Sequence, residues 1–267
     1  MTSRAQTTPE TVRITVLGGP TVLIEYGGLR FLTDPTFDPP QSYPGDFTKT
    51  TASTLAPDAL GHIDAVLLSH DEHIDNLDLA GLAFLPRVPV TLTTPSAAER
   101  LGTPSSPLGA DTPTSSSVTA QGLSPWQSVE LPRPAGGTVT VTAAPALHGP
   151  PGADLVVGEV TGFLLAGDAL PTVYISGDNA SLDLVREIAH RAGPIDTAVL
   201  FAGAVRRPVL EGALLTLDAA DAAEAAQILD ARRIVLAHVD GWAHFTEGTA
   251  ATIAAFTAAG LTDRLQL

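Results

Sequence analysis

The sequence predicts one α/β domain in which β-sheets lie inside and helices lie outside. Apolar runs of strand length dominate the first half of the 267 residues, whereas strand and helix patterns alternate in the second half. Hydrophobic residues make up 44% of the chain and charged residues 16%, a balance that supports a substantial core and excludes disorder for most of the chain. No repeat or linker divides the sequence, so we expect a single domain over residues 1–267 that begins with a polar leader, residues 1–11.

Short apolar runs separated by glycine pairs predict a β-meander at the start of the chain. The expected strands are Val12–Leu17, Thr21–Tyr26 and Leu29–Thr33. A stretch rich in proline, glycine and aspartate then extends to about Asp58 and indicates a loop. The continuous apolar run Ile63–Leu68 is typical of a strand buried on both faces, and a further short strand is expected at Val88–Leu92.

Residues 102–124 are rich in serine, threonine, proline and glycine, which predicts a surface loop or, alternatively, a mobile flap beside a substrate cleft. Strands are expected again at Ser128–Leu131, Thr138–Ala144, Val156–Leu165, Thr172–Ser176, Thr197–Phe201 and Arg233–Ala237. Capping and breaking residues bound three predicted helices. These helices are Ser181–Arg191, Asp218–Ala231 and Thr246–Ala259.

Composition excludes several classes of function. With 14 basic and 29 acidic residues the net charge is −15, and Lys49 is the single lysine, so a nucleic-acid partner is not expected. The absence of cysteine excludes disulfides, cysteine-ligated metals and thiol nucleophiles, so any metal must be held by His, Asp, Glu or Asn. A polar start and the lack of an apolar run of about 18 residues favour a cytoplasmic protein without a membrane span.

Four predicted strands each end in a side chain that can bind a metal. His70 and His73 follow Ile63–Leu68, and the remaining three residues of this kind follow later strands. They are His148 after Thr138–Ala144, Asp178 after Thr172–Ser176 and His238 after Arg233–Ala237. Side chains at strand ends can converge on one point while staying open to substrate, so these residues predict a metal site. His62 and His190 lack such a position and are expected to be ordinary surface histidines.

Five segments in a fixed order resemble the metallo-β-lactamase-fold hydrolase superfamily. They are Leu32-Thr33-Asp34-Pro35, residues 69–78, Pro145-Ala146-Leu147-His148, Ile175-Ser176-Gly177-Asp178 and residues 238–245. The sequence looks most like the branch that contains ascorbate-6-phosphate lactonase-like and N-acyl-phosphatidylethanolamine phospholipase D-like proteins. The resemblance implies a four-layer αβ/βα sandwich with mixed sheets, outer helices and a metal site at the edge of the two sheets.

The segment that corresponds to the family motif His-x-His-x-Asp-His departs from it. The chain reads His70-Asp71-Glu72-His73-Ile74-Asp75-Asn76, with one extra residue between the histidines and Asn76 in place of the last histidine. Residues three apart in extended chain point to the same side only if the backbone bends, so we expect a bulge at Asp71-Glu72 that brings His70 and His73 together. In the rival register Asp71 takes the first ligand position. The bulge is favoured because imidazole is the better zinc ligand.

The resemblance implies one or two divalent metal ions. His70, His73 and His148 would form the first site, Asp75 and His238 the second, and Asp178 would bridge them. Asn76 would offer an amide oxygen and weaken the second site. Zinc is the favoured ion, with manganese or iron as alternatives. Such a site suits hydrolysis of a lactone, ester or phosphodiester on a small-molecule substrate, and the alternative is a non-catalytic binding module with an altered metal motif. The sequence does not indicate an oligomeric state.

Residues near these strand ends have possible roles that follow from metal chemistry and from their positions in the sequence. Asp75 would orient the attacking water, and His244 would protonate the leaving group or cap the helix that follows it. Trp242 would line the pocket. The pair Arg206-Arg207 is either solvated or an anion clamp for the substrate. Finally, Asp34 would either hydrogen-bond a liganding histidine or form an Asx turn.

Overall fold

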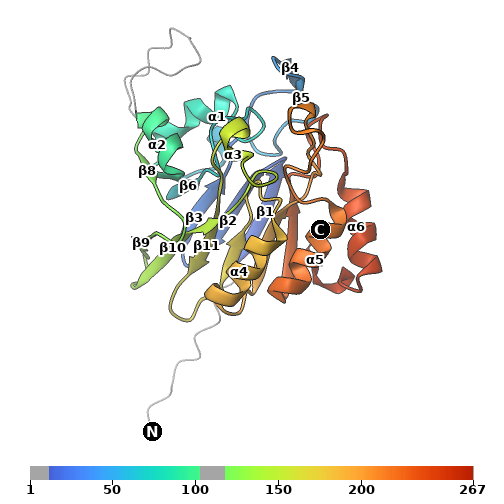
Figure 1. Ribbon diagram of the computed structural model, residues 1–267. Coiled ribbons are helices and arrows are strands. Elements are labelled where there is room, and N and C mark those ends of the chain that lie inside the picture. Colours follow the sequence, from blue (N-terminus) through green and yellow to red (C-terminus); the bar gives the residue numbers. More distant parts are fainter. Residues whose placement is uncertain (1–11, 103–117, 267) are drawn as a thin grey trace.

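Two β-sheets pack face to face at the centre of the computed structural model, which describes residues 12–102 and 118–266 (Figure 1). The first sheet has the order β1 (Arg13–Gly18), β2 (Thr21–Tyr26), β3 (Leu29–Thr33), β6 (Ala65–Leu67), β7 (Thr91–Thr93) and β8 (Ala120–Gly122). The second runs from β15 (Leu265–Gln266) through β14 (Arg233–Ala237), β13 (Thr197–Phe201), β12 (Val173–Ile175), β11 (Thr161–Ala166) and β10 (Thr138–Pro145) to β9 (Ser128–Pro132). A separate hairpin consists of β4 (Gln41–Tyr43) and β5 (Phe47–Lys49).

Helices cover the outer faces of both sheets. The short helices α1 (Leu79–Phe84) and α2 (Pro95–Gly102) belong to the first half of the chain, and α3 (Asp154–Val157) is a single turn between strands. On the side opposite α1 and α2 lie α4 (Leu182–Ala192), α5 (Ala219–Leu229) and α6 (Thr249–Ala258) (Figure 1). The predicted four-layer αβ/βα sandwich is therefore confirmed.

The strands are apolar on both faces because each sheet lies between two layers. In β2, Val22 and Ile24 enter the core between the sheets, whereas Leu23 packs outward with residues of the α1 region such as Phe84. In β13, Val199 belongs to the central core, and the neighbouring Ala198 and Leu200 pack with α4 and α5. Continuous apolar runs are what such two-sided burial requires.

Parallel pairing brings several strand ends to one edge of the molecule. The pairs β3–β6 and β6–β7 are parallel in the first sheet, as are β12–β13 and β13–β14 in the second. Because β10 and β12 are both antiparallel to β11, they also end at the same edge. The loops that follow β3, β6, β10, β12 and β14 therefore meet there, and these loops carry the candidate site residues.

The structure corrects some expected elements. The strand expected at Val156–Leu165 begins only at Thr161, because α3 and a Gly158 with φ of +92° precede it. Leu155 in α3 is 88% exposed, so that part of the apolar run belongs to no sheet. The loop expected up to Asp58 contains the hairpin β4–β5. Residues 1–11 and 103–117 lie outside the described residues, and the described end of the predicted 102–124 loop contains β8.

None of the helices in the described parts of the chain combines the length and apolarity that crossing a membrane would require.

Candidate metal centre

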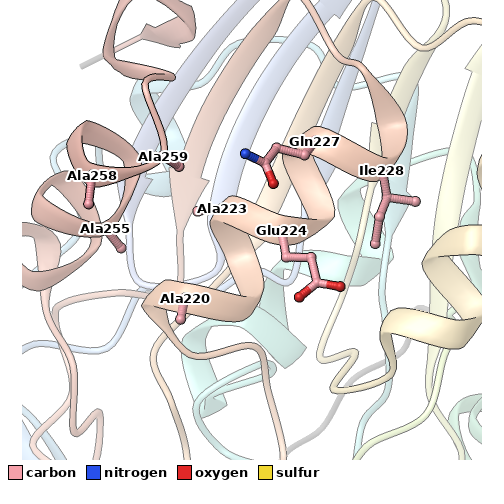
Figure 2. Close-up of a pocket in the computed structure, with 8 residues that line it drawn as sticks. All are labelled: Ala220, Ala223, Glu224, Gln227, Ile228, Ala255, Ala258 and Ala259. Atoms are coloured by element: carbon pink, nitrogen blue, oxygen red, sulfur yellow. The ribbon is translucent and has the colours of Figure 1, made fainter.

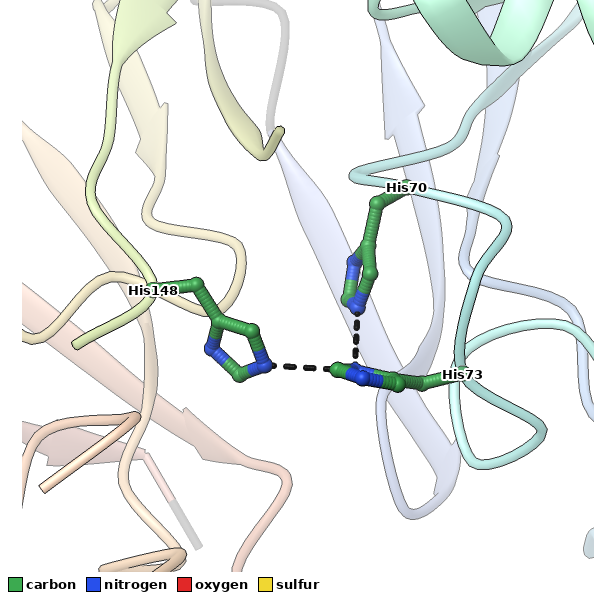
Figure 3. A group of neighbouring side chains, drawn as sticks. All are labelled: His70, His73 and His148. Carbon is green, nitrogen blue, oxygen red and sulfur yellow. Dashed lines mark hydrogen bonds between the residues drawn. The ribbon is translucent and has the colours of Figure 1, made fainter. Parts of the chain in front are cut away.

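Three imidazoles, two of them buried and that of His73 half-buried, converge where the loops after β6 and β10 meet (Figure 3). His70 Nε2 lies 2.9 Å from His73 Nδ1, and His148 Nε2 lies 3.2 Å from the same atom. Two nitrogen atoms that each lie about 2.1 Å from one tetrahedral zinc ion are about 3.4 Å apart. The three nitrogen atoms, which lie within 4.8 Å of one another, are therefore spaced as ligands of a single ion would be.

Hydrogen bonds on the far side of two rings fix which nitrogen faces the cluster. The Ser69 hydroxyl donates to Asp34 Oδ1 at 2.8 Å and lies 2.9 Å from His70 Nδ1, so the ring of His70 donates to Ser69. His148 Nδ1 lies 2.7 Å from the carbonyl oxygen of Leu215 and donates to it. Both rings thereby keep the lone pair of Nε2 free toward the cluster, which is how metal-binding histidines are oriented.

Burial makes these imidazoles hard to protonate. It lowers the pKa of His73 and of His148 to about 4 and that of His70 well below its usual range. For His70 and His73 the neighbouring imidazoles add to the effect. The three rings are neutral near pH 7, the state in which imidazole binds a metal ion.

A second group of titratable side chains adjoins the three histidines. His238 Nε2 lies 3.4 Å from Asp75 Oδ2 and 3.5 Å from Asp178 Oδ1, and His244 Nε2 lies 2.8 Å from Asp75 Oδ2. Burial opposes ionisation of Asp75, but contacts with the two imidazoles hold its pKa well below the usual range. Burial raises the pKa of Asp178. Asn76 belongs to this group through its Nδ2, which donates to Asp178 Oδ1 at 3.2 Å.

Several buried polar atoms of this second group have no hydrogen-bond partner within the described chain. They are Asp75 Oδ1, Asn76 Oδ1, both ring nitrogens of His238, and His244 Nδ1. Burying such atoms without a partner is costly, so an orphaned set beside three neutral imidazoles points to a ligand that satisfies them. Imidazole, carboxylate and amide donors suit zinc, manganese or iron, and the residues therefore fit a divalent metal ion.

Local backbone geometry brings Asp178 to this edge. Gly177 follows β12 with φ of +56°, and a Cβ on it would lie 2.5 Å from the carbonyl oxygen of Thr161. Only glycine fits such a tight, left-handed position, so the Ser-Gly-Asp sequence turns the chain immediately before the carboxylate. His238 has φ of +56° as well, and its ring stacks on Phe201 with centroids 5.5 Å apart.

The two registers of the motif differ in whether His70 or Asp71 is the first metal ligand, and the position of Asp71 distinguishes them. Strand β6 ends at Leu67, and the chain bends at Asp71 and Glu72 outside any β-ladder, so the convergence of His70 and His73 comes from a loop and not from a β-bulge. Asp71 turns to Arg100, whose Nε lies 3.0 Å from both of its carboxylate oxygens. His70 is therefore the residue of the two that lies among the histidines.

The other sequence-predicted residues differ in their relation to the cluster. Asp34 is buried and reaches His70 through Ser69, not directly. Trp242 is buried with its ring centroid 6.1 Å from that of His244. Arg206 is exposed and donates to the carbonyl oxygen of Gly212, so the structure does not bring it to the cluster.

Two further residues adjoin the site: Phe47, which the sequence did not single out, and Arg207, which it named with Arg206 as a solvated pair or an anion clamp. Phe47 of β5 lies 6.1 Å from His73 and 5.0 Å from His244 between ring centroids. Arg207 Cζ lies 4.1 Å from the centroid of the Phe47 ring. No sequence pattern marks Phe47, because it lies in a short hairpin without apolar periodicity. For Arg207 the sequence offered the same two interpretations as for Arg206, and nothing in it distinguished the two arginines.

A groove of about 680 Å³ lies between α5 and α6, separate from the candidate metal ligands (Figure 2). Small side chains such as Ala223 and Ala255 line most of it. Its charged lining residue, Glu224, is paired with Arg186 at 2.6 Å. The groove contains none of the metal-competent residues described above.

Comparisons with solved structures identify the fold. The chain is similar to isothiocyanate hydrolase from Delia radicum gut bacteria, with 19% identity, a TM-score of 0.75 and coverage of 95% of this chain and 94% of that one. For a possible metal-dependent hydrolase from Veillonella parvula DSM 2008 the values are 16%, 0.78, 96% and 96%. For CmlA, a diiron β-hydroxylase from Streptomyces venezuelae, they are 20%, 0.65, 97% and 53%. Such identities establish a shared fold, and a hydrolase and a hydroxylase both use it.

The family assignment comes from the sequence. A comparison with curated proteins gave no match. Residues 29–239, well over half of the chain, match the family model described as a beta-lactamase superfamily domain. Nothing in these comparisons singles out the ascorbate-6-phosphate lactonase-like or phospholipase D-like branch. The chain therefore belongs to the beta-lactamase superfamily and has the metallo-β-lactamase fold.

Proposed function

We propose that this chain hydrolyses a small molecule with the aid of a divalent metal ion held by His70, His73 and His148. The observation that carries the proposal is the convergence of three neutral imidazole nitrogens within 4.8 Å beside orphaned polar atoms of Asp75 and His238. Zinc is the favoured ion, and iron and manganese are the alternatives. Asp75, Asp178 and His238 would hold a second ion, with Asn76 as a weak oxygen donor.

A divalent ion in this position supplies charge that acidifies water and stabilises a developing oxyanion. Asp75 is ionised, since its pKa lies well below the usual range, and its carboxylate can accept a hydrogen bond from an attacking water and so orient it. His244 is hydrogen-bonded to Asp75 at 2.8 Å and can pass a proton to the leaving group. Its second ring nitrogen, which is orphaned among the described residues, faces away from Asp75 and is available for that transfer.

The substrate class follows from this arrangement only in outline. A lactone, ester or phosphodiester of the kind handled by ascorbate-6-phosphate lactonase-like proteins fits a water nucleophile beside two proton-transfer groups. The similarity to an isothiocyanate hydrolase adds a second kind of electrophilic carbon to the substrates worth testing. The net charge of −15 argues against a nucleic-acid substrate.

Metal analysis and turnover test the proposal together. We expect purified protein to carry zinc, manganese or iron at one ion or more per chain, and to hydrolyse at least one member of a lactone, ester, phosphodiester and isothiocyanate panel. His148→Ala should lose both the metal and the activity, whereas the exposed His190→Ala, as a matched control, should keep both.

The alternative to a hydrolase is a non-catalytic binding module, and Asn76 is the residue that suggests it. Its amide donates to Asp178 where the family motif has a metal-binding histidine. Protein that binds no metal at stoichiometric level and turns over no panel member after addition of zinc, manganese or iron would contradict the hydrolase proposal.

A further inference from the structure

The guanidinium of Arg207 lies beside the site, and one of its nitrogen atoms has no hydrogen-bond partner among the described residues. Its Cζ lies 4.1 Å from the centroid of Phe47, close enough for stacking on the ring face. Its Nη2 is buried and, within the described residues, makes no hydrogen bond. Guanidinium is a strong donor, and a buried N–H without an acceptor is costly unless a ligand supplies one.

Phe47 links this guanidinium to the metal centre. Its ring centroid is 5.0 Å from that of His244 and 6.1 Å from that of His73. The hairpin β4–β5 that carries Phe47 is anchored by Lys49, whose Nζ lies 2.9 Å from Asp78 Oδ2 in a buried ion pair. Arg207 is therefore held by an aromatic ring that itself contacts two side chains of the site.

The other cationic side chains of this region already have partners within the protein. The Arg206 Nη1 donates to the Gly212 carbonyl oxygen at 2.9 Å, and Arg206 is exposed. Lys49 is paired with Asp78, and Arg100 with Asp71 and Glu72. A substrate anion that approaches the histidine cluster thus meets an arginine whose charge is not already neutralised by a carboxylate in the described chain. This local charge matters because the protein as a whole carries a net charge of −15 and repels anions.

We propose that Arg207 binds an oxyanion, a carboxylate or a phosphate, on the substrate, while Phe47 holds the guanidinium plane in place. The planar fork of arginine matches such groups with paired hydrogen bonds. The substrate of the proposed hydrolase would then be an anionic small molecule, with its reacting group at the metal centre and its anionic group at Arg207. This inference rests on the proposed function for the location of the reacting group.

Equilibrium binding of simple acids to the metal-loaded protein tests the inference without turnover. The dicarboxylates succinate, glutarate and adipate offer one carboxylate to the metal centre and one to Arg207, whereas butyrate, pentanoate and hexanoate offer only the first. We expect at least one dicarboxylate to bind about tenfold more tightly than the monocarboxylate of equal length, in calorimetric titration. Replacement of one carboxylate of that acid by a phosphonate distinguishes a carboxylate site from a phosphate site.

Variants at two adjacent positions provide the contrast. Arg207→Ala should abolish the advantage of the dicarboxylate, Arg207→Lys should keep part of it, and Arg206→Ala should leave it unchanged. If Arg207→Ala does not fold, Arg207→Gln serves in its place, with the melting temperature as the check. Equal ratios in wild type and Arg207→Ala, or the same loss in Arg206→Ala, would overturn the proposal, as would a wild type with no dicarboxylate advantage.

The failure of this inference can be separated from the failure of the proposed function. Hydrolysis of neutral esters does not require Arg207, so turnover with no dicarboxylate advantage rejects the anion site alone. A dicarboxylate advantage that depends on Arg207, in protein that turns over no substrate, rejects the hydrolase and retains the anion site.

Discussion

Ser69 shows how a single residue outside the cluster controls it. Its backbone N–H and its hydroxyl both donate to Asp34 Oδ1 at 2.8 Å, and the hydroxyl accepts from the ring of His70. Burial raises the pKa of Asp34 well above its usual value, and these two hydrogen bonds oppose that rise. The chain Asp34–Ser69–His70 therefore orients a ring that would otherwise be free to rotate about its side-chain bonds.

Replacing Ser69 with alanine should weaken metal binding while leaving the fold intact. The ring of His70 loses the acceptor that keeps Nε2 directed at the cluster, and partners of this kind are worth about 10- to 100-fold in metal affinity. Competition with a chromophoric chelator measures the change. Ser128→Ala, at an exposed position on β9, is the control and should not alter affinity. Equal metal affinity of the two variants would show that Ser69 does not contribute to metal binding.

At the scale of elements, the buried ion pair between Lys49 and Asp78 joins the hairpin β4–β5 to the loop that carries Asp75 and Asn76. Asp78 also accepts hydrogen bonds from the backbone N–H groups of Phe37, Asp38 and Gly81, so it caps α1 and fixes the chain after β3 as well. One carboxylate thereby sets the relative positions of the hairpin, α1 and the metal-binding loop.

Removal of Lys49 should be strongly destabilising. The Lys49 and Asp78 side chains are only 3% and 0% exposed, so Lys49→Ala leaves a buried carboxylate without its counter-charge, at a cost of about 3 kcal/mol or more. Arg87 forms an exposed pair with Asp58, and Arg87→Ala should change stability by less than about 1 kcal/mol. Urea denaturation measures both. A Lys49→Ala variant as stable as Arg87→Ala would mean that the pair is not important for the hairpin.

The elements that the sequence predicted well are those with strong apolar patterns. The predicted ranges Thr21–Tyr26 and Thr197–Phe201 coincide with β2 and β13, because both strands are buried on two faces. The hairpin β4–β5 escaped prediction because its strands are three residues long and largely exposed or half-buried. In α3 the apolar run was misleading, since Leu155 faces solvent and no periodicity distinguishes it from a strand.

The candidate site was predictable to the extent that its residues follow strands. His148, Asp178 and His238 each lie within three residues of the end of a strand, and the strand pairing brings such positions to one edge. Of the partners that tune them, Asp34 was a candidate from the sequence, whereas Ser69 and Phe47 were not. Ser69 contacts Asp34 only because β3 and β6 are adjacent in the sheet, and Phe47 meets Arg207 only because a hairpin folds over the edge.

At the scale of the whole molecule, burial of the neutral imidazoles links stability to pH. The pKa values of His73 and His148 are about 4 in the folded protein, below the ordinary value of 6.5. Above about pH 6.5 neither the folded nor the unfolded chain protonates these rings, so they have no effect there. Between pH 6.5 and 4 the unfolded chain binds the protons and the folded chain does not. The free energy of unfolding therefore decreases as the pH is lowered through this range.

The metal-free protein should therefore lose stability progressively from about pH 6.5 to pH 4. A shift from 6.5 to about 4 corresponds to roughly 3 kcal/mol for each histidine at most. His238 acts in the opposite direction: burial lowers its pKa, but Asp178 and Asp75 outweigh that effect and raise it, so its protonation stabilises the fold as pH falls.

Urea denaturation in the presence of a chelator, at pH 7.5 and pH 5, measures the net dependence of the free energy of unfolding on pH. His148→Asn removes one of the three rings whose pKa burial lowers and should flatten the slope, whereas His190→Asn on the exposed face of α4 should preserve it. A slope unchanged in His148→Asn would show that the buried cluster does not control the acid response, and a slope flattened in His190→Asn would place the control on the surface.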